Sequence, residues 1–271
     1  YDETLEHVPH DRMPSLERFM LHRLHELDIV VREGYESYDF KKVYAALFNF
    51  CVVDLSAFYL DIRKDSLYCD RPDDNRRKAC RTVMHEIFMR LTAWLAPIMP
   101  FTMDEAWLSR FPSETDSVHL RTFPKTPSDW HDGALAENWR TIRRLRRVVN
   151  GALEVERREK RIGSSLEAAP HVHVTDPSYR AALAAETTGE VDDFLAELSI
   201  TSQAHLVEGA ASDTAFRLDD TPDIAVVSGR ADGRKCARSW KYSTEIGADK
   251  RYPELSPRDA DAVAWWDATP A

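Results

Sequence analysis

The chain has 271 residues, of which 43% are hydrophobic, and its formal net charge at pH 7 is -10. This length suits one sizeable core with one or two smaller units. No run approaches the roughly 20 consecutive apolar residues of a membrane helix, and the acidic residues 1–14 lack the apolar core of a signal peptide. We therefore expect a cytoplasmic protein that makes no membrane contact.

The four cysteines, Cys51, Cys69, Cys80 and Cys236, are scattered without paired spacing. A disulfide framework is therefore not expected, and we predict reduced thiols. The chain opens on Tyr1 without an initiator methionine. We expect either a fragment of a longer protein or a processed product.

The first predicted helix covers residues 15–33, with Ser15 as its N-cap and Gly34 as its stop. A second, longer helix begins after Asp39, which can cap it, and runs to about Asp65, on the order of 40 Å. We call this second helix the spine helix. Its apolar side chains recur at intervals of three and four residues, which places them on one broad face. They are Phe40, Val43, Tyr44, Leu47, Phe48, Cys51, Leu55, Phe58, Tyr59 and Ile62. So wide a stripe needs cover from more than one neighbouring helix.

Three more helices are predicted before residue 168. Residues 79–95 have helical apolar spacing and are stopped by Pro97 and Pro100. Thr102 and Glu105 have the spacing of a capping box, which predicts a short helix over 103–110. Residues 134–161 follow a long connection. The fold class is therefore mainly α, with an antiparallel helical bundle over residues 1–168.

The pattern changes after Ala168. Strand-like stretches at 171–175 and 200–207 flank two short helices at 179–186 and 191–198, which predicts a small α/β unit over residues 169–222. Residues 223–271 start with a strand at 224–227 and continue through a basic loop with glycines. We call residues 223–271 the terminal module.

Positive charge is concentrated in three clusters although the chain is acidic. Residues 137–161 hold nine basic residues against four acidic ones. Within them, Arg140, Arg143, Arg144 and Arg147 share one helix face, which we call the arginine ridge, and Lys160 follows. The second cluster is Arg76, Arg77, Lys78 and Arg81, and the third includes Arg230, Arg234, Lys235, Arg238 and Lys241 beside the indole of Trp240. These clusters suit a phosphate backbone, and the indole suits stacking on an unpaired base. A solvated helix face has the same spacing, so the simpler interpretation stays open for each cluster.

The stretches NFCVVDLSAFYLDIRKDSLYCD and LTAWLAPIMPFTMDEAW resemble the helical anticodon-binding domain of class I aminoacyl-tRNA synthetases for large aliphatic amino acids. The run Lys160, Ile162, Gly163, Ser165, Leu166, Glu167 and Ala168 is similar to the close of that domain in isoleucyl enzymes. The resemblance is strong over residues 14–168 and recognisable over 223–264. It implies recognition of the anticodon stem and loop of isoleucine tRNA, with the catalytic half of the same enzyme as the other partner.

The catalytic motifs of this family, His-Ile-Gly-His and Lys-Met-Ser-Lys-Ser, do not occur in the sequence. We therefore expect the chain alone to be inactive, although the resemblance implies a parent enzyme that uses ATP and magnesium. We expect a monomer. The alternative is a synthetase-derived helical module that binds a protein partner and has lost RNA recognition.

Bacterial isoleucyl enzymes often end in a four-cysteine zinc module, and the resemblance aligns its ligand positions with Cys236, Ser239, Ser256 and Asp259. Serine is a poor zinc ligand, so we predict a degenerate module without zinc. We expect apolar packing to hold it, through Trp240, Tyr242, Ile246, Leu255 and Val263.

Other candidate sites are weaker. His171 and His173 share a strand face but lack a third ligand nearby in the sequence, and His22 and His25 suit solvated or core positions. Asp54 lies within the apolar face of the spine helix, where a buried carboxylate needs a partner such as a helix-end donor or an arginine. No catalytic constellation is predicted.

Overall fold

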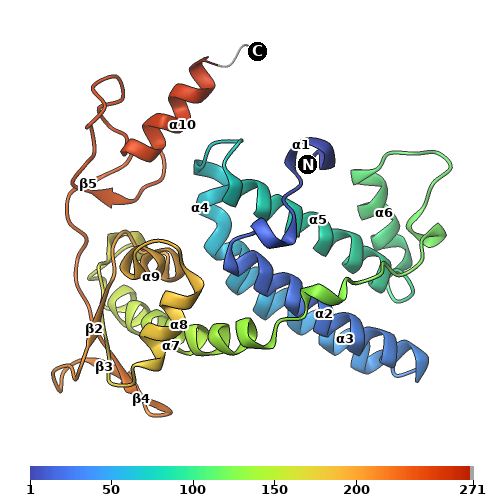
Figure 1. Ribbon diagram of the computed structural model, residues 1–271, viewed down its shortest axis with the longest axis horizontal. Coiled ribbons are helices and arrows are strands. Elements are labelled where there is room, and N and C mark those ends of the chain that lie inside the picture. Colours follow the sequence, from blue (N-terminus) through green and yellow to red (C-terminus); the bar gives the residue numbers. More distant parts are fainter. Residues whose placement is uncertain (269–271) are drawn as a thin grey trace. The chain divides into compact units, whose positions relative to one another are not determined.

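The computed structural model describes residues 1–268 (Figure 1). The chain forms two compact units. The first contains Tyr1–Arg63 and Asp73–Asp132, and the second contains Lys64–Pro72 and the residues from Gly133 onward. The boundaries of these two units do not coincide with residues 168 and 222. The predicted division into three domains therefore stays a prediction.

The first unit is helical. Its elements are α1 (Glu3–Glu6), η1 (His10–Arg12), α2 (Ser15–Glu36), α3 (Phe40–Asn49), η2 (Phe50–Leu60), α5 (Asn75–Leu95), α6 (Pro100–Arg110), η3 (Val118–Leu120) and η4 (Ser128–Trp130). Helix α4 (Asp61–Cys69) begins in this unit and ends in the second. Helix α2 packs against α3 and α5, and α5 packs against α6 (Figure 1).

Both predicted ends of the first helix differ from the structure. The N-cap of α2 is Pro14, and the helix continues through Gly34 to Glu36. A Cβ on Gly34 would lie 2.5 Å from Cγ2 of Val43, so this glycine allows α2 and α3 to approach closely. The predicted capping box also fails, because Thr102 lies inside α6, which starts at Pro100.

The predicted spine helix is present as the continuous series α3, η2 and α4. Asp39 accepts a hydrogen bond from the backbone N–H of Lys42 at 3.0 Å, which confirms its capping role. Residues 50–60 have π-helical hydrogen bonding, which is rare at this length. The buried side chains that follow Leu47 are Phe50, Asp54, Phe58 and Tyr59.

More than one helix covers the buried face of the spine helix, as expected, because Tyr59 of η2 interacts with Cys80 of α5 as well as with Glu17 of α2. Helix α2 covers the face of Val43 and Leu47, which are 0% and 1% exposed. Phe40, Tyr44 and Phe48 are about half exposed. These aromatic side chains form a row at intervals of four residues on the open face of α3.

The spine helix also meets the length and composition criteria for a membrane span. It is the one such helix among residues 1–268, with 30 residues and a mean hydropathy of 1.7 over its most apolar window. This is weak evidence of membrane insertion, since core helices of water-soluble proteins meet the same criteria. Its packed face also carries the buried charges of Asp54 and Arg63.

Those buried charges are paired with side chains from α2. Arg63 donates two hydrogen bonds of 2.6 Å to Glu17, and Tyr59 donates one of 3.1 Å to the same carboxylate. Asp54 accepts from Arg23 at 3.2 Å, which confirms the predicted arginine partner. Burial and the nearby charge of Glu17 raise the pKa of the Cys80 thiol to about 12, so this cysteine stays protonated in the core.

The second unit combines helices with a small sheet. Its further elements are α7 (Gly133–Arg158), η5 (Ser165–Glu167), β1 (His171–Val174), α8 (Ser178–Glu186), α9 (Val191–Ser199), β2 (His205–Glu208), β3 (Phe216–Leu218), β4 (Thr221–Val227), β5 (Arg234–Lys235), β6 (Tyr242–Ser243) and α10 (Pro257–Ala268). The predicted strand at 200–207 begins only at His205, because Ile200 caps α9 in the left-handed region.

A four-stranded sheet of order β2-β1-β4-β3 lies at the centre of this unit. Strands β1 and β2 are parallel and are joined through α8 and α9, whereas β4 runs antiparallel to β1 and β3. Helix α7 packs on α8, α9, β3 and β4 (Figure 1). The structure therefore places α7, predicted as part of the first bundle, beside the sheet, because its apolar face covers buried strand residues such as Val226.

Strand β4 also differs from its predicted assignment, because it belongs to the sheet and not to a separate terminal module. The rest of the terminal module consists of the β5–β6 hairpin and α10. Gly233 leads into this hairpin with φ of 92°, and a Cβ there would lie 2.2 Å from the carbonyl carbon of Ser243. Only glycine fits this turn.

Candidate nucleic-acid interface

The arginine ridge lies along the solvent side of α7, opposite the buried Leu145 and Val149. Arg140 and Arg147 have 67% and 52% of their side chains exposed. Arg140 pairs with Glu137 one turn earlier, and Arg143 is half-buried. The structure thus presents the ridge as the sequence predicts, on a helix anchored by its apolar face.

Acidic residues of the second unit lie next to the ridge. Both oxygens of Asp220 accept hydrogen bonds of 2.7 Å from Arg147, which lower the pKa of Asp220. Hydrogen bonds from Ser178 lower the pKa of Asp176, and the charge of Arg144 lowers it further. Arg144 is exposed and makes no side-chain hydrogen bond or ion pair with any residue in 1–268. Among the ridge arginines, Arg144 therefore has the guanidinium most available to a phosphate.

Lys160 follows the end of α7 in the left-handed region, with φ of 58°. The backbone N–H of Lys160 donates to the carbonyl of Arg157, and that of Arg161 donates to Glu156. These bonds satisfy terminal carbonyls of the helix. The side chain of Lys160 is exposed, so its ammonium group extends the positive surface of α7.

The second basic cluster opens α5 in the first unit. Asp74 caps this helix and accepts hydrogen bonds from the backbone N–H groups of Arg76 and Arg77. The side chains of Arg76, Arg77 and Lys78 are half-buried. Arg81 is bound to Glu6 of α1, with one hydrogen bond of 3.0 Å. Arg81 therefore connects two helices of the first unit.

Trp240 is the most exposed aromatic side chain of the terminal module, with 61% of its surface accessible. Hydrogen bonds between Cys236 and Lys241, and between Trp240 and Cys236, close the turn that carries it. Its φ of 64° turns the side chain out of the hairpin. The ammonium of Lys235 lies 5.1 Å from the centre of the indole ring. The predicted packing role of Trp240 is therefore wrong, whereas an open ring face next to a cation is present.

The other two predicted base contacts of the terminal module face inward. Arg238 donates to Asp259 at 2.9 Å and to the carbonyl oxygen of Tyr68 at 3.0 Å. The ammonium of Lys241 lies 3.2 Å from Asp65. Burial alone would raise the pKa of Asp65, but the hydrogen bond from Arg258 and the charges of Lys241 and Arg258 lower it to about 2. Sequence reasoning had no signal for the contacts with Tyr68 and Asp65, because these residues are about 170 to 190 positions from their partners.

The four aligned ligand positions of the terminal module come together around one carboxylate oxygen. The thiol of Cys236 lies 3.1 Å from Oδ2 of Asp259, and the hydroxyls of Ser239 and Ser256 lie 2.6 and 2.7 Å from it. Burial would raise the pKa of Asp259, but the Ser239 hydrogen bond and the charge of Arg258 lower it. The carboxylate is therefore ionised and fully hydrogen-bonded, an arrangement that does not fit zinc.

The histidine candidates do not form a site either. The ring of His22 is buried and lies 5.3 Å from that of His131, and the ring of His171 lies 4.8 Å from that of His205. In the part of the chain that the structure describes, no group of three or more histidine, cysteine or acidic side chains could hold a metal ion.

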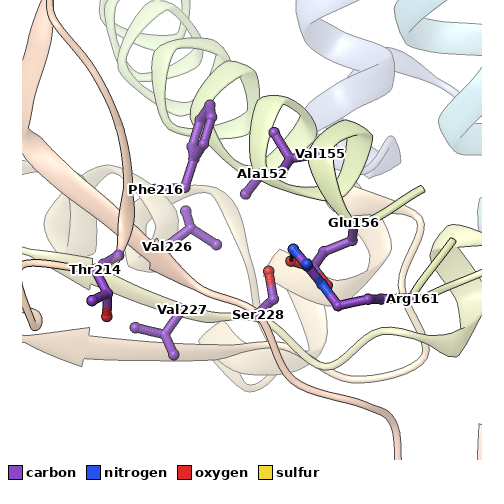
Figure 2. A pocket seen from close by; sticks show the side chains of 10 residues that line it. Ala152, Val155, Glu156, Arg161, Thr214, Phe216, Val226, Val227 and Ser228 are labelled. Carbon is purple, nitrogen blue, oxygen red and sulfur yellow. Dashed lines mark hydrogen bonds and ion pairs between the residues drawn. The ribbon is translucent and has the colours of Figure 1, made fainter. Parts of the chain in front are cut away.

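A pocket of about 450 Å³ lies between the end of α7 and strands β3 and β4 (Figure 2). Ala152, Val155, Phe216 and Val226 line its apolar side, and Glu156 lies at the polar end. The hydrogen bond from Arg161 lowers the pKa of Glu156. A carboxylate with a lowered pKa is a weak general base.

The family described as the anticodon-binding domain of tRNA ligase matches residues 17–173, more than half of the chain. The chain belongs to this family. The matched segment contains α2, the spine helix, α5, α6 and α7. The arginine ridge and the basic cluster of α5 therefore lie within the anticodon-binding domain.

Curated relatives extend the similarity through the terminal module. The chain is 54% identical to an isoleucine–tRNA ligase of Brucella abortus over 258 residues, 51% to that of Caulobacter vibrioides over 268 and 50% to that of Agrobacterium fabrum over 258. These alignments cover 95%, 99% and 95% of the chain. They confirm the resemblance to isoleucyl enzymes. The chain spans about a quarter of the length of these relatives.

Proposed function

We propose that this chain recognises the anticodon stem and loop of isoleucine tRNA, as the C-terminal portion of an isoleucine–tRNA ligase. The family match over residues 17–173 carries this proposal, and the exposed cations of α7 support it. In this proposal the parent enzyme uses ATP and magnesium to attach isoleucine to its tRNA. The catalytic half would lie elsewhere in the longer polypeptide, so the chain alone does not charge tRNA.

Phosphate contacts would come from the arginine ridge and Lys160. Guanidinium groups bind phosphate oxygens in a bidentate fashion, and such contacts position a nucleic acid without reading its sequence. Arg144 would bind a phosphate directly, whereas Arg147 would have to release Asp220 before it could bind one. The acidic surface elsewhere in the chain disfavours unspecific binding of polyanions.

Base contacts would come from Trp240, with Lys235 beside it. Anticodon bases are single-stranded and can stack on an exposed aromatic ring. Arg238 and Lys241, which the sequence predicts as base contacts, are better suited to hold the turn that presents Trp240, because both are bound to carboxylates within the second unit. We further propose that the parent enzyme acts as a monomer in the cytoplasm.

The test is a titration of the chain into labelled isoleucine tRNA and a non-cognate tRNA at two salt concentrations. Binding that favours the cognate tRNA and weakens with salt is expected. Equal binding of both tRNAs, or no binding, would contradict self-sufficient recognition by this chain.

Variants locate the phosphate contacts. Arg144→Ala together with Arg147→Ala should weaken binding and reduce the salt slope by about one unit for each phosphate that is no longer bound. Arg251→Ala is the matched control, because Arg251 is also an exposed arginine paired with a neighbouring aspartate, Asp249. An unchanged slope in the double variant would exclude the ridge.

The alternative, a module that binds a protein partner and has lost RNA recognition, is not favoured by the family match or by the ligase names of the relatives. Trp240→Ala separates the two. Loss of discrimination between tRNAs, with a smaller loss of affinity, is expected for base stacking, and equal losses for both tRNAs would argue against a reading role.

A further inference from the structure

The most unusual polar cluster of the second unit is centred on Asp259, the first-turn aspartate of α10. Its side chain is 0% exposed, as is that of Cys236 in the β5–β6 turn. Oδ2 accepts hydrogen bonds from Cys236, Ser239 and Ser256, while Oδ1 lies 2.9 Å from Arg238 and 3.4 Å from Arg258. Five donors from two turns thus converge on one carboxylate.

The positions that converge are those that the resemblance aligns with four zinc ligands. A structural zinc site needs four ligands, which are deprotonated thiolates, neutral imidazoles or carboxylates, in a closed tetrahedral set. Here two positions are serines whose hydroxyls donate hydrogen bonds to Asp259, the single thiol donates a hydrogen bond to the same oxygen, and only one carboxylate is present. A cation at this centre would also meet the guanidinium groups of Arg238 and Arg258. These donors therefore suit the negative charge of the Asp259 carboxylate and do not suit a metal cation.

The Asp259 cluster also reaches the segment Lys64–Pro72. Arg238 donates to the backbone carbonyls of Tyr68 and Cys69, which have no further partner within α4 because the helix ends there. Arg258 donates to Asp65 at 3.1 Å and lies 3.5 Å from Asp70. The two arginines that neutralise Asp259 are thus the same two that bind the end of α4.

We propose that the Asp259 carboxylate takes the structural place of a metal ion in the terminal module: it holds the two turns together by hydrogen bonds, and through Arg238 and Arg258 it fixes them to the end of α4. The module then folds without zinc. This role is independent of tRNA binding, so a failure of the proposed function would leave it standing.

The first experiment concerns the metal. The purified 271-residue chain should contain less than about 0.1 zinc per molecule by elemental analysis, and neither EDTA nor added zinc should change amide hydrogen exchange in residues 234–268. About one zinc per chain, with loss of protection in EDTA, would overturn the proposal.

The second experiment removes the charge. Asp259→Asn keeps the shape but removes the buried charge that Arg238 and Arg258 share, and we expect the exchange protection of residues 234–256 to fall at least tenfold. Asp261→Asn is the matched control on the same helix, since Asp261 is 62% exposed and its contact with Arg71 is at the surface. Equal effects of the two changes would overturn the proposal.

A milder variant covers the case in which Asp259→Asn fails to fold. Ser239→Ala with Ser256→Ala removes two of the five donors and retains the ion pairs, so it should reduce protection in the same residues by a smaller factor. Unchanged protection in this variant would also count against the proposal.

The reverse exchange tests whether the four positions form one site. In the variant Ser239→Cys, Ser256→Cys and Asp259→Cys, Cys236 completes a set of four thiols. We expect this variant to bind about one zinc per chain and to lose protection in EDTA, unlike the wild type. A variant that folds and binds no zinc would show that the positions do not converge as described.

Discussion

The spine helix and the terminal module are stabilised by opposite means. The spine helix buries Val43, Leu47 and Phe50 against α2, and its few buried charges form matched pairs inside this apolar interface. In residues 228–268 of the terminal module, few large apolar side chains are buried, among them Ile246, and a buried carboxylate connects the turns. A hydrophobic core tolerates many sequences of similar volume, whereas a polar centre requires each donor in place.

The largest effect on stability is expected at the buried ion pair between Arg63 and Glu17, which lies inside the apolar interface. Arg63→Met should destabilise the chain by about 3–5 kcal/mol, because Glu17 would stay buried without its partner. Urea denaturation measures the change. Combining Arg63→Met with Glu17→Leu should recover much of the loss, and no recovery would mean that the pair is needed for more than charge balance.

The apolar part of the spine helix can be tested by two adjacent positions. Leu47→Ala should cost about 3 kcal/mol, because Leu47 is 1% exposed and its removal leaves a cavity. Phe48→Ala should change stability by less than about 0.5 kcal/mol, because this ring is 56% exposed. Similar losses at both positions in thermal unfolding would contradict the contrast between the covered and the open face of α3.

The ion pairs that join α4 to the terminal module should make stability depend on pH. The pKa of Asp65 is lowered to about 2 in the folded chain and is about 3.9 when unfolded. Because the carboxyl group loses its proton more readily in the folded chain, it stabilises the fold at pH values above about 4. About 2 kcal/mol of this stability should be lost as the pH falls from about 4 to about 2. Asp65→Asn should remove this pH-dependent contribution.

Urea denaturation of the wild type and of Asp65→Asn at pH 7 and at pH 2 gives the measurement. The difference between the two proteins should shrink at the lower pH. Asp213→Asn, at an exposed position, serves as control and should follow the wild type at both values. A constant difference for Asp65→Asn would contradict a stabilising ion pair.

The smallest effect on stability is expected at the arginine ridge. Arg140→Ala removes a surface pair with Glu137 and should change the free energy of unfolding by less than about 0.5 kcal/mol. If the ridge binds phosphate, the same change should weaken tRNA binding and reduce its salt dependence. A large stability loss would mean that this arginine belongs to the fold.

Sequence patterns predicted most of the helices and strands. The helical apolar spacing marked the spine helix, α5 and α7, and alternation marked β1 and β4, because these signals are local. The predicted boundaries of the elements were less accurate. Gly34, for example, allows α2 and α3 to approach closely and does not end α2. The exposure of Arg144 was also predictable, because it lies opposite the apolar face of α7.

The roles of the buried polar groups were decided only by the tertiary structure. The sequence alone showed that three of the four thiols expected in a zinc module are absent, and that Asp54 needs a partner. It could not show that Asp259 lies between Cys236 and the two serines, or that Arg238 turns inward to the end of α4. Helix and strand periods are set by neighbours in the chain, whereas a buried carboxylate is stabilised by donors that folding brings together from distant positions.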